Sequence, residues 1–178
     1  MQLITLKDKQ FKPYIASEKI MEAVKNIAKK INEDLKNDQP LFLVVLNGSF
    51  MFASDLLKEI DFNCEISFIK VASYHGTSSS GTVTEIIGLT EDVSNRTVVI
   101  LEDIVDTGRT LEKLINVLSK KNIKQYKVAT AFFKPTEYKK QMKIDYVGME
   151  IAHDFVVGYG LDYDGLGRNL KDVYILAN

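Results

Sequence analysis

Cysteine, histidine and long apolar runs are all scarce in this sequence, and each shortage excludes a class of protein. One cysteine and two histidines among 178 residues exclude an internal disulfide framework and a structural zinc site built from Cys and His. No apolar run approaches the ~20 residues that cross a bilayer, and the amino terminus lacks the apolar core of a secretory signal. We therefore expect a cytoplasmic protein with no membrane partner.

An excess of charge of either sign is also missing. The 23 basic residues are balanced by 24 acidic ones, giving a net charge of -1, so no global positive field is available for a nucleic-acid backbone. We expect no nucleic-acid partner, and any anion site must be local. Hydrophobic side chains make up 46% of the 178 residues, enough for one domain that buries roughly 70% of its unfolded surface.

Apolar segments of strand length alternate with helical patterns along the chain. Apolar residues recur at spacings of three and four over residues 17–36, which predicts an amphipathic helix with Ser17 as its cap. This alternation predicts an α/β fold with a mostly parallel, doubly wound sheet, whose ligands lie at the carboxyl ends of the strands. The other expected elements are strands at 41–46, from 64, at 97–101 and at 126–133, and helices from 50 and from 110.

Residues 73–82 (SYHGTSSSGT) break this pattern. Their Gly, Ser and Thr residues cannot bury themselves, so we expect a mobile loop. A lone histidine in a polar loop is usually just solvated, and His75 is given no role.

The segment ILEDIVDTGRT at residues 100–110 carries the clearest chemistry. Residues 107–110 are expected to present backbone N–H groups and two hydroxyls at a helix amino terminus, with Gly108 allowing a tight turn around a phosphate. Glu102 and Asp103 would repel that phosphate unless their partners were hydroxyls or a metal ion. A sugar phosphate satisfies both demands. Taken separately, the same residues could be helix caps and exposed acids at a strand end.

Three further segments accompany residues 100–110. They are residues 46–49 (LNGS), Ser73-Tyr74, and residues 155–163 (FVVGYGLDY) with Arg168 after them. Together, and with Lys134, the four segments resemble those of type I phosphoribosyltransferases, in particular the hypoxanthine phosphoribosyltransferases.

This resemblance implies a fold and an activity. The fold would be a mostly parallel twisted sheet flanked by helices, with a small hood built from the chain termini. The chain would form one domain, residues 1–178, with a core at about 17–150 and the hood at 1–16 and 151–178. The enzyme would transfer ribose phosphate from phosphoribosyl pyrophosphate to hypoxanthine, and to guanine, giving IMP or GMP and pyrophosphate, and it would be a homodimer or homotetramer.

The resemblance also implies roles around the ribose and the base. Glu102 and Asp103 would bind the ribose hydroxyls, and Asp106 would be the general base that removes the imidazole proton of the purine. The remaining substrate contacts implied are the phosphate ligands Thr107, Gly108, Arg109 and Thr110, then Lys134 at the exocyclic oxygen, Phe155 stacked on the purine, and the Val156 backbone at its edge.

On the pyrophosphate side, the resemblance implies contacts from Asn47 and Gly48, with a non-proline cis peptide after Leu46, and from Arg168. Magnesium would be held by Glu102, Asp103 and Asp162. Ser73 and Tyr74 would form the base of a lid over the transition state.

Simpler readings of these residues remain open at this stage. Lys134 could be an ordinary exposed lysine, Phe155 could be a core residue, and Asp162 and Arg168 could be surface charges. The sequence also departs from the family: Asn47 stands where many relatives have lysine, Ala152-His153-Asp154 replaces a stretch that often carries proline, and Gly167 replaces an aromatic residue.

Two other functions compete with the transferase. A regulator could keep the fold to sense phosphoribosyl pyrophosphate while binding nucleic acid, but it should show a basic face. Another α/β nucleotide enzyme, such as a methyltransferase, would have no need of the Thr107–Thr110 sequence.

Overall fold

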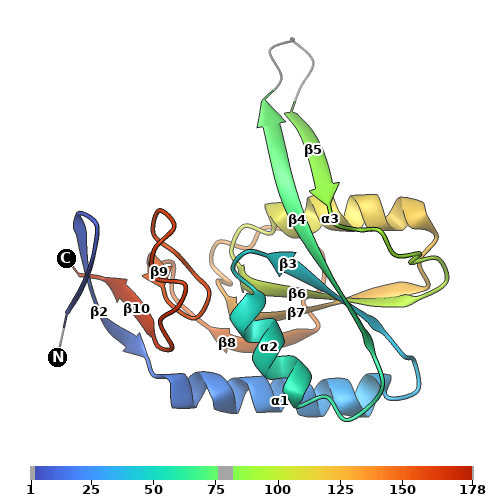
Figure 1. Cartoon of the computed structure of the whole chain (residues 1–178), viewed down its shortest axis with the longest axis horizontal. Coiled ribbons are helices and arrows are strands. Elements are labelled where there is room, and N and C mark those ends of the chain that lie inside the picture. Colours follow the sequence, from blue (N-terminus) through green and yellow to red (C-terminus); the bar gives the residue numbers. More distant parts are fainter. Residues whose placement is uncertain (1–2, 76–81, 178) are drawn as a thin grey trace.

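A computed structural model describes residues 3–75 and 82–177, and its larger unit is a six-stranded sheet (Figure 1). The strand order is β5-β4-β3-β6-β7-β8, in which β5 is antiparallel to β4 and all other neighbours are parallel. The predicted mostly parallel α/β sheet is therefore confirmed. The strands are β3 (Leu41–Leu46), β4 (Glu65–His75), β5 (Thr82–Ile87), β6 (Thr97–Val105), β7 (Gln125–Phe133) and β8 (Tyr146–Glu150).

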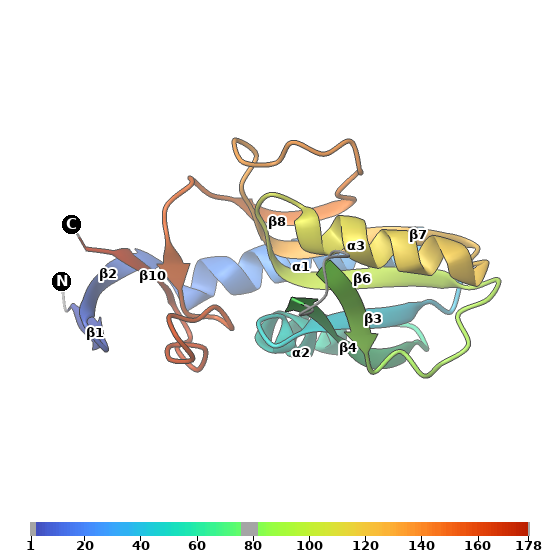
Figure 2. The ribbon, with the colours of Figure 1, turned by 90° about the horizontal axis from the view of Figure 1, so that it is seen from above.

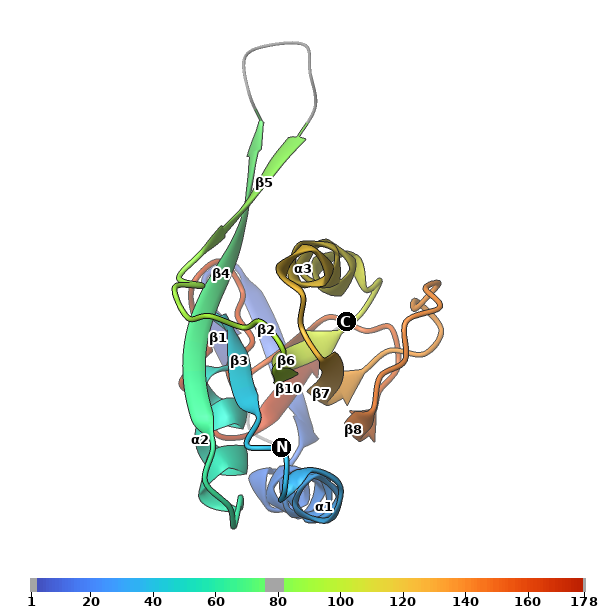
Figure 3. The same cartoon turned by 90° about the vertical axis from the view of Figure 1, so that its right-hand side faces the viewer.

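Helices cover both faces of this sheet (Figure 3). Helices α1 (Ser17–Leu35) and α2 (Phe50–Lys58) lie on one face, and α3 (Arg109–Leu118) lies on the other, continued by the 3-10 turn η1 (Ser119–Lys121). In β3, Phe42 and Val44 belong to the core under α1 and α2, whereas the alternate residues belong to the core under α3. This two-sided burial explains why β3 is a continuous apolar run.

A second, smaller sheet is built from both ends of the chain (Figure 2). Its antiparallel order is β1-β2-β10-β9, from β1 (Ile4–Leu6), β2 (Lys9–Ile15), β10 (Val173–Leu176) and β9 (Val156–Val157). It lies near the start of α1 and beside the carboxyl ends of the central strands. The small terminal unit implied by the resemblance is present, and we call it the hood.

The amino end of α1 differs from the sequence prediction. Ala16, not Ser17, occupies the cap position, and its side chain makes no capping hydrogen bond. The Ser17 backbone N–H instead donates to Asp172 Oδ1 at 2.7 Å. A carboxylate of the hood, 155 residues away, thus takes over the role that a local hydroxyl was expected to play.

The loop predicted at 73–82 is also partly wrong. Ser73, Tyr74 and His75 belong to β4 and Thr82 to β5, with Ser73 opposite Thr84 in antiparallel register. The flanking VAS and VTEII residues have the β-branched content that strands favour. The rest of the predicted loop, 76–81, lies outside the described residues.

Strand β6 is longer than predicted. It runs past Leu101 through both acids to Val105, because its parallel pairing with β7 continues to Val105 opposite Phe133. None of the helices in the described ranges is long and apolar enough to span a membrane.

Candidate active site

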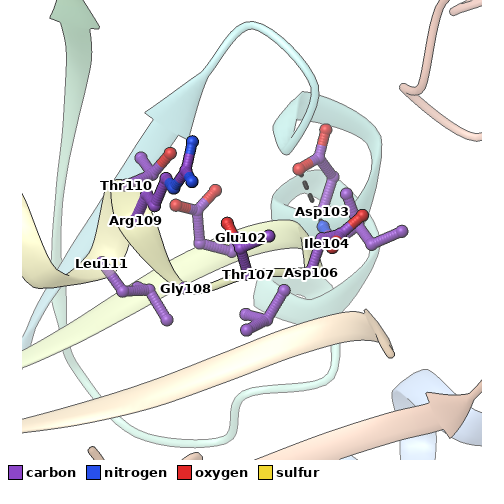
Figure 4. A pocket seen from close by; sticks show the side chains of 10 residues that line it. Glu102, Asp103, Ile104, Asp106, Thr107, Gly108, Arg109, Thr110 and Leu111 are labelled. Atoms are coloured by element: carbon purple, nitrogen blue, oxygen red, sulfur yellow. Dashed lines mark hydrogen bonds between the residues drawn. The ribbon is translucent and has the colours of Figure 1, made fainter. Parts of the chain in front are cut away.

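The turn between β6 and α3 forms the floor of a pocket of about 270 Å³, lined by residues 102–111 (Figure 4). Gly108 occupies the cap position of α3 with φ +76°, a conformation that favours glycine. Its carbonyl accepts the Glu112 N–H at 3.0 Å, while helix geometry leaves the first N–H groups of α3 without intrahelical partners. Thr107, Arg109 and Thr110 are exposed at this turn. The predicted tight glycine turn at the amino terminus of a helix is present.

The two acids at the end of β6 point apart (Figure 4), as successive residues of a strand do. Glu102 is only 5% exposed, and burial, with a smaller contribution from the Asp103 charge, raises its pKa well above the usual value. Neither acid has an ion-pair partner in the described part of the chain. They are therefore not the exposed acids of the simpler reading.

Asp103 faces a different neighbourhood. Burial raises its pKa to about 6, although the Ile104 N–H, 2.8 Å from Oδ1, and the positive charge of Arg168 oppose the shift. The charge of Asp162 adds to the increase. A hydroxyl donor or a cation near Asp103 would restore its ionised form.

Asp106 and Lys134 come together across the ends of β6 and β7. Lys134 Nζ lies 3.3 Å from Asp106 Oδ2 and 3.3 Å from the His153 carbonyl oxygen. The lysine side chain is 8% exposed and the aspartate 44% exposed, so Lys134 is not an ordinary surface lysine. The backbone N–H of Lys134 also donates to the Val105 carbonyl at 2.9 Å, which holds the two backbones together beside this pair.

Gly48, just after β3, joins three segments of the site. A Cβ on Gly48 would lie 1.4 Å from Asp103 Oδ2, and a Cβ on Gly160 would lie 1.9 Å from the Gly48 carbonyl oxygen. Only glycine fits at both positions. The Leu46–Asn47 peptide is cis, as the family resemblance implied. The turn after β3, the end of β6 and the segment after β9 are thus in direct contact.

Arg168 and Asp162 are paired at this junction. The guanidinium lies 2.6 Å from Asp162 Oδ1 and donates to the Gly160 carbonyl at 2.8 Å, while Asp162 Oδ2 accepts the Gly165 N–H at 2.7 Å. Their side chains are 30% and 27% exposed. Both charges are therefore partly buried and paired with each other.

Phe155 lies at the hood side of the site. It is 46% exposed, so it is not a core residue, whereas Val157 two positions on is fully buried. Its ring centroid is 6.3 Å from that of Phe11 and 5.9 Å from that of Tyr163. Val156 is buried in β9, where it pairs with Ile175.

The three acids predicted to hold magnesium do not gather into one cluster. Within residues 3–75 and 82–177, no group of three or more His, Cys, Asp and Glu side chains is placed to hold a metal ion. Asp103 and Asp162 interact electrostatically, but Glu102 points away. Ser73 and Tyr74 are described here only through their backbone, which pairs with Thr84 and Val83.

Two structural supports of the site were not foreseen from the sequence. Tyr159, buried at 2% exposure, donates its hydroxyl to Asp55 Oδ2 of α2 at 3.0 Å and packs edge-on against Phe132. Burial raises the pKa of this tyrosine far above its usual value. The glycine-rich run at 158–167 was the nearest sequence signal, but it does not reveal which side chains meet α2.

The second support is the segment after Lys134, which lies against the turn between β6 and α3. A Cβ on Gly108 would lie 2.6 Å from Tyr138 Cε2 and 3.1 Å from Lys140 Cγ. Lys140 Nζ is 2.7 Å from Glu112 Oε2, in the first turn of α3. This wall leaves no room for a side chain at position 108.

Comparison with known proteins gives one consistent result. A family model described as the phosphoribosyl transferase domain matches residues 13–164. A hypoxanthine-guanine phosphoribosyltransferase of Staphylococcus epidermidis is 42% identical over 158 residues, which cover 88% of each chain. Crystal structures of a hypoxanthine phosphoribosyltransferase from Staphylococcus aureus (35% identity, TM-score 0.85, covering 93% of this chain and 91% of that one) and of a hypoxanthine-guanine phosphoribosyltransferase from Bacillus anthracis (31%, 0.83, 93% and 96%) share the fold.

Proposed function

The chain belongs to the phosphoribosyltransferase family, and on this premise we propose how its pocket works as a transferase of purine salvage. The enzyme moves ribose phosphate from phosphoribosyl pyrophosphate (PRPP) to hypoxanthine or guanine. The bond from the anomeric carbon to the purine nitrogen forms, the bond to pyrophosphate breaks, and the imidazole proton of the purine leaves. The products are IMP or GMP and pyrophosphate.

The Asp106–Lys134 pair is the observation that carries this proposal. A 6-oxopurine presents an N–H of its imidazole ring and its exocyclic oxygen on neighbouring positions of one edge. An exposed carboxylate lies 3.3 Å from a buried ammonium, and this pair matches that edge. The carboxylate can accept from the purine N–H, and the ammonium can donate to the exocyclic oxygen. Asp106 is the proposed general base, and Lys134 stabilises the negative charge that grows on the purine oxygen.

The β6–α3 turn is the proposed phosphate site. Thr107, Gly108, Arg109 and Thr110 offer backbone N–H groups, two hydroxyls and a guanidinium to the phosphate of PRPP. Glu102 and Asp103 accept hydrogen bonds from the ribose hydroxyls, which favours their ionised forms. Their negative charge lies near the anomeric carbon, where positive charge develops as pyrophosphate leaves.

On the other side of the ribose, the proposed pyrophosphate contacts are the backbone of Asn47 and Gly48 and the guanidinium of Arg168. Asn47 takes the place of a lysine that many relatives have, so the proposal assigns it a backbone contact. Phe155 stacks on the purine and the Val156 backbone contacts its edge. Ser73 and Tyr74 are proposed to reach the substrates from β4, which projects from the sheet beside the site (Figure 1).

The proposed cofactor is Mg²⁺. Carboxylate oxygens are its preferred protein ligands, and Mg²⁺ is usually held by one or two carboxylates together with substrate phosphates and water. Glu102, Asp103 and Asp162 supply such oxygens, and the charge of Asp162 acts on Asp103. When bound, the ion neutralises charge on the pyrophosphate.

We also propose that residues 1–178 act as one domain, with the core at about 17–150 and the hood at 1–16 and 151–178. The contacts of Tyr159 with Asp55 and of Gly160 with Gly48 support joint action of the two parts. A cytoplasmic homodimer or homotetramer is proposed as well. Two side chains on the same face of β4, Ile66 (46% exposed) and Phe68 (50% exposed), are available to a second copy.

The test is turnover with labelled bases. The protein is incubated with PRPP, Mg²⁺ and radiolabelled hypoxanthine, guanine, xanthine or adenine, and nucleotide formation is measured for each base. We expect IMP and GMP. Tight binding of PRPP without conversion of any purine would contradict the proposal and favour a regulatory protein.

A further inference from the structure

Three aromatic rings of the hood pack against one another, and one of them, Phe155, is the ring proposed to stack on the purine. The centroids of Phe11, Phe155 and Tyr163 lie 5.9 to 6.3 Å apart in every pairing. The Phe155–Tyr163 pair is edge-to-face at 86°, and the other two pairs are tilted. Such distances and angles are those of favourable aromatic contacts.

Within this cluster, the rings differ in exposure. Phe11 is fully buried, whereas Phe155 is 46% exposed. Phe155 is therefore supported on its inner side by two rings and open on the outer side. A ring that must offer one face to a flat ligand needs such one-sided support, because a free phenylalanine would lose rotamer entropy on binding.

Tyr163 is itself held by the amino-terminal hairpin. Its hydroxyl donates to Asp8 Oδ1 at 2.8 Å, and Lys9 Nζ lies 4.8 Å from its ring centroid. Its backbone forms a tight pair with Leu166, with N–H to carbonyl distances of 2.9 and 3.0 Å in the two directions. The ring thus has little freedom to move away from Phe155.

The backbone two residues before Phe155 is hydrogen-bonded to Lys134 of the proposed Asp106–Lys134 pair. The His153 carbonyl accepts from Lys134 Nζ at 3.3 Å, the same nitrogen that faces Asp106. Phe155 is therefore fixed from both directions, through its backbone toward Lys134 and through its ring toward Tyr163.

We propose that Tyr163 is a positioning residue for the purine: its ring, anchored by Asp8 and Lys9, holds Phe155 at the angle that accepts the base. This inference rests on the proposed function, in which Phe155 stacks on the purine. Tyr163 touches no substrate and acts through Phe155 alone. Its loss should weaken binding of the base and leave PRPP binding intact.

The test compares KM values for hypoxanthine and for PRPP in the full-length enzyme. Tyr163→Leu should raise KM for hypoxanthine about three- to tenfold, the factor equivalent to the loss of one aromatic pair, with KM for PRPP within about twofold of wild type. Tyr163→Phe keeps the ring but loses the hydroxyl that Asp8 anchors, and it should raise KM for hypoxanthine less than Tyr163→Leu does. Tyr174→Leu, a half-buried tyrosine of β10, is the matched control and should leave both values unchanged.

A double variant separates positioning from general damage. In a Phe155→Ala background, Tyr163→Leu should cause no further rise in KM for hypoxanthine, because the residue it acts through is gone. Additive effects, an unchanged KM for hypoxanthine in Tyr163→Leu, or an equal rise in KM for PRPP would each overturn the inference. If Tyr163→Leu does not fold, Tyr163→Met is measured in its place with the same outcomes.

Failure of the inference and failure of the proposed function give different results. If Phe155→Ala raises KM for hypoxanthine and Tyr163→Leu does not, only the positioning role of Tyr163 is wrong. If Phe155→Ala itself has no effect, the proposed stacking role of Phe155 is wrong, and the inference falls with it.

Discussion

At the scale of single residues, the site works by placing charges where water cannot fully screen them. Lys134 is almost completely buried, yet its amine faces an exposed carboxylate. Glu102 and Asp103 are held with raised pKa values because burial removes water from them. These groups are more costly to the folded protein than surface charges, and such perturbed groups in a pocket are typical of functional sites.

Replacing Asp106 by Asn tests the general base. The amide keeps the shape of the side chain but cannot accept the purine proton, so kcat should fall by about 10² to 10⁴, the range of general acid–base catalysis. KM for PRPP should change little. Steady-state kinetics with hypoxanthine measures both, and Asp61→Asn, an exposed acid away from the pocket, is the control. Unchanged kcat would remove Asp106 from this role.

The raised pKa of Asp103, about 6 instead of 3.8, predicts a pH effect on stability. Between these values the folded protein binds more protons than the unfolded chain, so this group lowers the free energy of unfolding as pH rises, by up to about 3 kcal/mol in total. Asp103→Asn should therefore be more stable than wild type at pH 7, and the difference should shrink toward pH 4. Urea unfolding in metal-free buffer measures this, and parallel pH profiles would contradict it.

At the scale of elements, the turns after β3 and β6 are packed closely against other segments of the chain, so few substitutions fit in them. The turn after β3 leaves no room for a Cβ at Gly48, because the Asp103 carboxylate occupies that space. The turn after β6 leaves none at Gly108, because Tyr138 and Lys140 lie against it. Each turn is shaped by a different segment of the chain.

Gly48→Ala should displace the Asp103 carboxylate or the β3 turn. Because both are proposed to contact PRPP, we expect kcat/KM for PRPP to fall at least about tenfold, as misplacement near a reacting centre does. Asn63→Ala, at an exposed residue away from the pocket, is the comparison, and it should leave KM for PRPP within about twofold. Equal effects of the two variants would show that the Asp103 contact does not matter.

Lys140 should neutralise the negative charge of Glu112 next to the proposed phosphate site. Glu112 lies in the first turn of α3, where an unpaired negative charge would repel a bound phosphate. Lys140→Gln should raise KM for PRPP about two- to fivefold, a small effect because the pair is partly exposed. Lys140→Gln combined with Glu112→Gln should return KM to the wild-type value. A KM for PRPP as high in the double variant as in Lys140→Gln alone would contradict this.

At the scale of the whole molecule, the hood and the core meet through a few specific contacts. Tyr159 reaches Asp55 in α2, Asp172 receives the first N–H of α1, and Gly160 lies against Gly48. These contacts bring the carboxyl-terminal segment against the turn after β3 and the end of β6, where the charge of Arg168 acts on Asp103.

Tyr159→Phe tests this docking. It removes the hydroxyl that donates to Asp55 while keeping the ring against Phe132, so the free energy of unfolding should fall by about 1–2 kcal/mol. Urea denaturation measures the change. Tyr14→Phe, an exposed tyrosine of β2, should have no effect, and equal stability of all three proteins would show that this hydrogen bond contributes nothing.

The sequence predicts the central sheet and the glycine turn between β6 and α3 because their signals are local. The β3 run is apolar throughout, and the two acids near the end of β6 are followed within a few residues by the Thr-Gly-Arg-Thr turn. Strand β9 has two residues and β1 three, too few for a period to show. The cap of α1 by Asp172 and the contact of Gly160 with Gly48 depend on residues more than 100 positions apart, and no local pattern encodes them.

The central claim is that the turn between β6 and α3 holds the phosphate while Asp106 and Lys134 receive the base. The most direct measurement is a crystal structure of the enzyme with IMP, Mg²⁺ and pyrophosphate. We predict phosphate density over residues 107–110, with the hypoxanthine between Phe155 and the Asp106–Lys134 pair. Nucleotide bound anywhere else, or bound here with the purine turned away from Asp106, would contradict the account.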